Sequence, residues 1–82
     1  MKISHQVALM PLAMARPGNK VTIERIEAGR ALSHRLAEMG LTPGTEVEVC
    51  EGRTYGPLLI QSGSTRLVLG QGMGMKILVR ER

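Results

Sequence analysis

The 82-residue sequence has very few aromatic residues: Tyr55 is the only one, and phenylalanine and tryptophan are absent. Grooves that bind proline-rich peptides and platforms that bind single-stranded nucleic acid are both built largely from aromatic rings. A domain with one ring cannot build either surface in the usual way. The composition therefore argues against a peptide-groove module and against a base-stacking module.

Cysteine and long apolar runs are also scarce. Cys50 is the only cysteine, so no disulfide within the chain is possible and nothing indicates an oxidising compartment. The apolar stretch from Val7 to Met14 is interrupted by Pro11 and does not resemble a secretory signal. No run approaches the roughly 20 apolar residues that a membrane helix needs. We therefore expect a cytoplasmic protein that is not itself in the membrane.

Catalytic residues are missing in the combinations that common reactions need. The sequence contains no aspartate, so the neighbouring Ser33 and His34 cannot complete a serine–histidine–aspartate triad. The glycines Gly70, Gly72 and Gly74 lack the helix and strand that must follow a dinucleotide-binding turn, and close backbone packing at a barrel corner is the better interpretation. A core this small also has no room for a deep substrate cavity. We predict that the protein is not an enzyme and uses no cofactor.

Metal ligands are equally sparse, and neither a CxxC nor an HxxxH spacing occurs. His34 and Glu38 are four residues apart and are expected to share the exposed side of a helix. A physiological site needs three or four converging ligands, so this pair is at most a weak metal candidate and is interpreted as a solvated pair. Cys50 falls on the solvent side of its strand and is interpreted as a partly covered structural thiol.

Eleven lysines and arginines against seven glutamates give a net charge of +4 and a pI near 10.0. The bases are scattered among the acids, as where Arg25 lies between Glu24 and Glu27. This pattern favours a mixed, solvated surface over a dedicated nucleic-acid footprint, although the latter stays open as an alternative.

Hydropathy periods predict about five short strands and one short helix. Val21 and Ile23 alternate with polar residues, and either a bulge or the end of the strand is expected near Arg25 because Ile26 falls out of step. Apolar residues then recur at helical spacing over residues 29–39. Further strands are expected at 46–50, 58–61, 66–69 and 75–80, with turns at 17–19 and 62–64 and a short irregular link at 70–74.

The end of the predicted helix is the most strongly determined stretch. Gly40 occupies the place where a left-handed residue ends a helix, and Leu41 follows as the apolar residue that folds back over Leu36 in the last turn. Pro43 and Gly44 then suit the two central positions of a type II turn. About five strands and one helix in so short a chain indicate a small, strongly bent barrel.

Three segments together resemble the ferrous iron transport protein A (FeoA) family. They are RLAEMGLTPG at residues 35–44, YGPL at residues 55–58 and RLVLGQGMGMKILV at residues 66–79. The resemblance runs from about Val7 to Arg80, and residues 1–6 lie outside it. It implies that the chain is mainly β, one SH3-like barrel domain over residues 1–82.

The resemblance also implies a function. It suggests an accessory protein of ferrous-iron uptake, an interaction module acting on a membrane ferrous-iron transporter that has a cytoplasmic GTP-binding domain. It further implies an association with transition metal ions. A small basic nucleic-acid-binding β-barrel is the alternative, although we expect no nucleic-acid partner because stacking rings are lacking.

Partner contacts are expected at Arg35, Tyr55, Leu58 and Leu78, which combine charged and apolar side chains, and either Leu58 or Leu59 is expected to face outward. The stem of Arg35 is also expected to cover the core edge, with its guanidinium reaching carbonyls or a glutamate, so that Arg35→Ala would lower the melting temperature by about a degree or more. The apolar contacts leave a weak homo-oligomer open.

Overall fold

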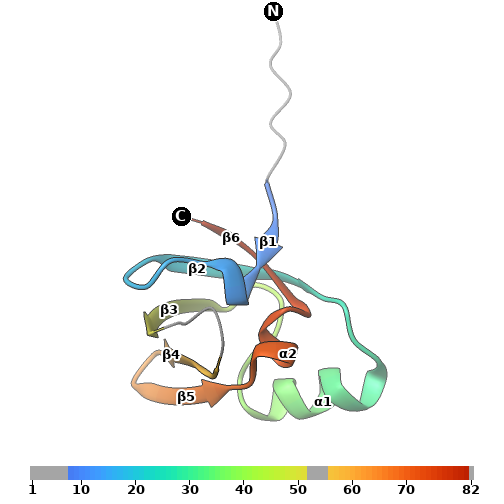
Figure 1. The fold of residues 1–82 in the computed structure, drawn as a ribbon. Coiled ribbons are helices and arrows are strands. Elements are labelled where there is room, and N and C mark those ends of the chain that lie inside the picture. Colours follow the sequence, from blue (N-terminus) through green and yellow to red (C-terminus); the bar gives the residue numbers. More distant parts are fainter. Residues whose placement is uncertain (1–7, 52–55, 82) are drawn as a thin grey trace, which may run out of the picture.

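Six antiparallel strands form one sheet in the order β1-β6-β2-β3-β4-β5, as Figure 1 shows for this computed structural model, which describes residues 8–51 and 56–81. The strands are β1 (Met10–Pro11), β2 (Lys20–Ile26), β3 (Glu46–Glu51), β4 (Leu58–Ser62), β5 (Thr65–Leu69) and β6 (Ile77–Glu81). The helices are the 3-10 helix η1 (Leu12–Met14), α1 (Arg30–Glu38) and α2 (Gln71–Gly74). The mainly β class is confirmed, with one strand more than predicted.

The strand β2 lies at the centre of the sheet and pairs with both β3 and β6. Its register against β6 shifts between Ile23 and Arg25, so the predicted bulge is confirmed. The bulge adds one residue to β2, which returns Ile26 to the inner face, where it packs partly buried against the core. The strand therefore contributes apolar side chains to the core along its whole length.

The core lies inside the curved sheet and is entirely aliphatic. Alternation along β2, β3 and β6 places every second side chain inward, and η1, α1 and the residues after α1 close the remaining sides. The buried apolar residues are Leu12, Ala15, Val21, Ile23, Leu36, Leu41, Val47, Val49, Leu58, Ile60, Leu69, Ile77 and Val79. Because the set lacks aromatic rings, the core depends on the packing of branched side chains.

The helix α1 ends in a Schellman motif, as predicted. The Leu41 N–H donates to the Leu36 carbonyl at 2.9 Å and the Gly40 N–H donates to the Ala37 carbonyl at 2.9 Å. Gly40 has a φ of +85°, which only glycine adopts without strain. Leu36 and Leu41 are both fully buried, so the motif directs both side chains into the core.

The type II turn after α1 is confirmed and is bound to the central strand. The Thr45 N–H donates to the Thr42 carbonyl at 3.0 Å, and Gly44 has a φ of +94°. The turn then pairs with Ile23, whose carbonyl accepts from the Gly44 N–H at 2.7 Å and whose N–H donates to the Thr45 carbonyl at 2.8 Å. These bonds fix the end of α1 against the sheet.

Two segments differ from the sequence-based expectations. Residues 10–14 form the short strand β1 and the helix η1, and residues 71–74 form the one-turn helix α2 in place of an irregular link. The two short helices pack together because Gly74 has no side chain. A Cβ on Gly74 would lie 3.2 Å from the Ala13 Cβ and 2.5 Å from the Leu58 Cδ1. Close backbone packing is thus confirmed at Gly74, whereas Gly70 and Gly72 face open space.

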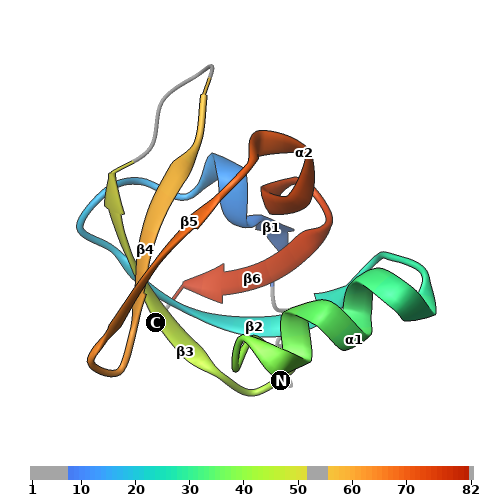
Figure 2. The same ribbon diagram turned by 90° about the horizontal axis from the view of Figure 1, so that it is seen from below.

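Seen from below, in Figure 2, the strands β3, β4 and β5 form one side of the barrel while β2 and β6 form the other, and α1 lies along β2. Among the described residues, no helix is long and apolar enough to cross a membrane.

Replacing Gly40 with alanine is expected to lower the free energy of unfolding by about 1 kcal/mol, because a Cβ is disfavoured at positive φ. Urea denaturation measures the change. Gly72→Ala is the matched control: Gly72 has no positive φ and open space around it, so this variant is expected to be neutral or slightly stabilising. Equal stability of the two variants would contradict the proposed role of Gly40.

Candidate functional site

The predicted His34–Glu38 pair forms on the exposed side of α1. The His34 Nδ1 lies 3.9 Å from the Glu38 Oε2, and the two side chains are 74% and 67% exposed. Within residues 8–51 and 56–81, no group of three or more histidine, cysteine or acidic side chains could hold a metal ion. The pair therefore has no third ligand among the described residues, and its geometry is that of a solvated surface pair.

Arg35 does not make the contacts expected of it. Its side chain is exposed in the last turn of α1, and it has no hydrogen bond or ion pair with another described residue. The expected attachment of its guanidinium to carbonyls or a glutamate is therefore wrong for the described part of the chain. Arg35 is therefore a cation near the C-terminal end of α1, which is the negative end of the helix dipole.

Leu58 and Leu78, which were also expected to contact a partner, do not form one surface. Leu58 is 1% exposed and faces the core, where it packs near Gly74, so its expected place on the surface is wrong. Its neighbour Leu59 is half-buried and faces the other way. Leu78 is half-buried on β6 between Pro11 and Arg25 of the flanking strands. Tyr55 lies outside the described residues.

Cys50 is a half-buried free thiol on β3. Its Sγ lies 3.9 Å from the Glu48 carbonyl. The position agrees with the predicted partly covered thiol.

Charged side chains pair with neighbours of opposite sign across the surface. The Arg25 Nε lies 3.2 Å from the Glu27 Oε2, and Arg80 of β6 pairs with Glu24 of β2. Pairing of this kind divides the surface charge into small mixed clusters. The geometry thus favours the mixed, solvated surface over a continuous basic stripe.

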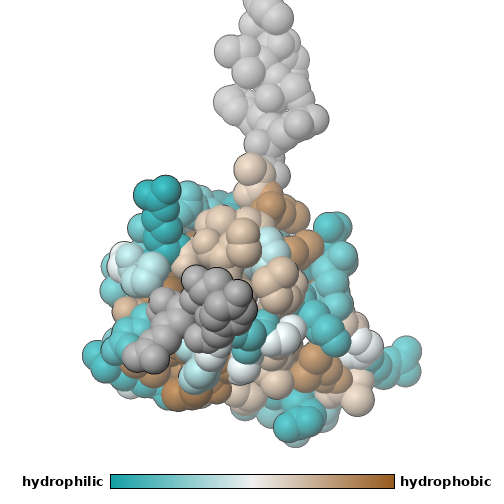
Figure 3. Space-filling model, in the orientation of Figure 1, coloured by the Kyte–Doolittle hydropathy of each residue, from teal (hydrophilic) through white to brown (hydrophobic). Residues whose placement is uncertain are grey.

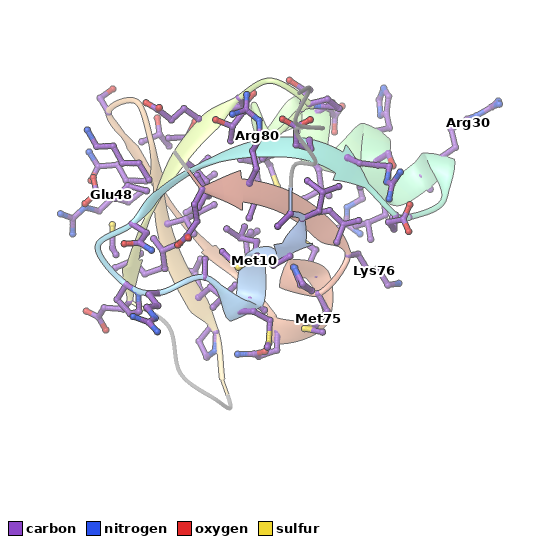
Figure 4. All side chains as sticks on the ribbon, turned by 90° about the horizontal axis from the view of Figure 1, so that it is seen from above. Met10, Arg30, Glu48, Met75, Lys76 and Arg80 are labelled. Carbon is purple, nitrogen blue, oxygen red and sulfur yellow. The ribbon has the colours of Figure 1, made fainter. Side chains whose placement is uncertain are left out.

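Exposed apolar side chains gather on one face that the sequence did not single out. Leu9 is 38%, Met14 65% and Met75 48% exposed, and they flank the half-buried Met10 of β1. We call these four residues the methionine face. Figure 4 shows Met10 and Met75 on the same side of β6, and Figure 3 shows a group of weakly hydrophobic atoms over β1 and η1.

The methionine face is hollowed around Met10. One open hollow is lined by Ala8, Leu9, Met10, Arg80 and Glu81, and a second is lined by Met10, Met14, Arg16, Asn19 and Glu81. Methionine side chains are unbranched and polarizable, so such a surface adapts to partners of different shape. Two exposed cations, Arg16 and Lys76, border it without an ion pair to another described residue.

One compositional signal for this face was present in the sequence. The chain has six methionines and one aromatic residue. In a chain with so few rings, methionine is the residue type that can provide an adaptable apolar contact surface. The face itself could not be read from periodicity, because β1, η1 and α2 are each shorter than five residues.

The chain is similar in sequence to known proteins. The family described as "FeoA domain" matches residues 10–81. A curated protein of Methanocaldococcus jannaschii, named "Putative Fe(2+) transport protein A", is 33% identical over 73 residues, which cover 89% of this chain and 88% of that protein.

Several solved structures have a fold similar to that of this chain. The crystal structure of an iron uptake regulatory protein (FeoA) has a TM-score of 0.86 at 33% identity and covers 92% of this chain and 100% of that chain. An iron(II) transport protein A from Clostridium thermocellum has a TM-score of 0.81 at 27% identity, covering 88% of this chain and 45% of that chain. A manganese-dependent transcriptional repressor shares the fold, with a TM-score of 0.84 at 21% identity over 95% of this chain and 44% of that chain. The expected SH3-like fold class is confirmed.

Replacing Arg35 with alanine is expected to lower the free energy of unfolding by less than about 1 kcal/mol, because only a helix-dipole interaction is lost. Salt at about 1 M shortens the screening length to roughly 3 Å and should remove the difference. Urea denaturation at low and high salt measures it. Arg30→Ala, at the opposite end of α1, is the control and should not destabilise. A salt-independent loss above about 2 kcal/mol would restore the structural role first expected for Arg35.

Proposed function

This chain belongs to the FeoA family, which is associated with ferrous iron transport, and from that premise we propose that it is a docking module that acts on the cytoplasmic part of a membrane ferrous-iron transporter. The observation that carries the proposal is the family match over residues 10–81. The transporter's cytoplasmic part includes its GTP-binding domain, so the module works in the cytoplasm. Its role is that of an accessory protein.

The methionine face supports the docking role and is the surface that we assign to it. Leu9, Met14 and Met75 are three of the five large apolar side chains that are exposed in the described part of the chain, and Leu9 and Met14 each line one of the two hollows beside Met10. Interface centres are enriched in methionine and depleted of lysine and glutamate, while charged residues lie at the rim. Arg16 and Lys76 occupy rim positions and favour a partner surface that is acidic at its border.

Two substitutions test the assignment. The double variant Met14→Gln/Met75→Gln keeps side-chain length but makes the face polar, and it is expected to weaken binding to the transporter's purified cytoplasmic part about tenfold or more. Isothermal titration calorimetry or a pull-down measures the change.

Met39→Gln is the matched control, because Met39 is also exposed (38%) but lies at the end of α1, outside the methionine face. It is expected to bind like the wild type. Loss of binding in the control alone would move the docking surface to α1, and failure of the wild type to bind in every nucleotide state and at every salt concentration would overturn the proposed function.

The nucleic-acid alternative has a separate test. The scattered ion pairs predict that the chain does not bind a generic single-stranded or double-stranded oligonucleotide at about 50 mM salt. Fluorescence anisotropy measures this directly. Binding that falls steeply as salt is raised would support the nucleic-acid alternative instead.

A further inference from the structure

The strand β5 (Thr65–Leu69) forms one edge of the sheet and is paired on one side only. Its partner is β4, and the sheet order ends at β5. Figure 2 shows β4 beside β5, with no strand running along its other side. The described part of the chain therefore leaves one complete strand edge without a neighbour.

The hairpin turn fixes which backbone groups face outward. Ser62 and Thr65 flank the two-residue turn, where Gly63 has a φ of +61°, so they form a hydrogen-bonded pair. Hydrogen-bonded pairs alternate along an antiparallel ladder, and the next ones are Ile60–Leu67 and Leu58–Leu69. The N–H and C=O groups of Arg66 and Val68 consequently point away from β4.

These four outward groups have no hydrogen-bond partner within residues 8–51 and 56–81. The edge has few of the features that commonly protect a free strand: β5 contains no proline and no bulge, and Arg66 is its one charged residue. The opposite edge differs, because β1 has only two residues and one of them is Pro11. A five-residue edge left open in this way is a template for pairing with another strand.

We propose that β5 accepts an extended segment of another protein as a seventh, antiparallel strand. The added residues opposite Arg66 and Val68 would exchange four backbone hydrogen bonds with these two residues. This inference is independent of which protein the methionine face contacts.

The side chains of β5 specify the chemistry of that segment. Arg66 and Val68 lie on the outer face. Val68 is 66% exposed, and the Arg66 Nε donates a hydrogen bond of 3.3 Å to the Gln61 Oε1. An acidic residue opposite Arg66 and a β-branched residue opposite Val68 match these neighbours. The residue between them faces the half-buried Leu67 and should be apolar. Read from N- to C-terminus, the segment is apolar, apolar, acidic.

A second copy of this chain is a poorer occupant. Each copy carries a net charge of +4, and β5 contains no acidic residue to place opposite Arg66. A foreign segment with a carboxylate therefore fits the edge better.

The test uses a synthetic, end-capped peptide whose centre is valine-valine-glutamate flanked by threonines, added to ¹⁵N-labelled protein. In the free protein, the amides of Leu67 and Leu69 should exchange slowly with solvent, while those of Arg66 and Val68 should exchange fast. The peptide should shift and protect the Arg66 and Val68 amides. A peptide with lysine in place of glutamate should bind about fivefold more weakly.

Two variants of the protein, each with its own control variant, test whether the peptide binds at β5. Val68→Pro removes an N–H that the fold does not use and should weaken peptide binding about tenfold or more, whereas Val68→Thr, which keeps the N–H, should bind nearly normally. Arg66→Glu should reverse the preference so that the lysine peptide binds better. Arg30→Glu changes the net charge equally at the far end of α1, where Figure 4 shows Arg30 pointing away from the molecule, and should leave binding unchanged.

Three outcomes would overturn the proposal. One is the absence of any shift at millimolar peptide concentration. Another is unchanged binding by Val68→Pro or by Arg66→Glu. The third is a concentration-dependent shift of the Arg66 and Val68 amides without peptide, which would make a second copy the occupant.

Discussion

The fold depends on the pair of backbone hydrogen bonds that Ile23 makes with the turn after α1. Because the Ile23 carbonyl and N–H are engaged by Gly44 and Thr45, the central strand β2 holds the end of α1, the longest helix in the described part of the chain. The Schellman motif at Gly40 sets the angle at which the chain leaves the helix, and it places Leu36 and Leu41 in the aliphatic core. Sheet, helix and core are therefore joined at one short segment.

The segments β1, η1 and α2 lie outside this junction, and their side of the barrel carries the methionine face. The segment η1 buries Leu12 but leaves Met14 exposed, Met75 is exposed directly after α2, and the close approach of η1 and α2 depends on the missing Cβ at Gly74. The methionines that remain outside form a deformable surface that adapts to partners of different shape, which a rigid aromatic groove would not do.

Sequence reasoning succeeded where local backbone chemistry decides the structure. The helix stop at Gly40, the Pro43-Gly44 turn and the bulge before Arg25 each follow from residues close together in the chain. It failed where packing between distant segments decides: Leu58 and Leu59 are chemically alike, and only the β4 register shows that Leu58 faces inward. The methionine face was missed for the same reason, since it assembles from residues 9–14 and Met75, which sequence periodicity cannot connect.

We propose that this chain meets the transporter through the methionine face. Methyl NMR of protein labelled with ¹³C at its methionine methyl groups, with the unlabelled cytoplasmic part of the transporter added stepwise, tests this contact. The signals of Met10, Met14 and Met75 are expected to broaden or shift while that of Met39 stays unchanged. Perturbation confined to Met39, with the other three unaffected, would contradict it and place the contact on α1.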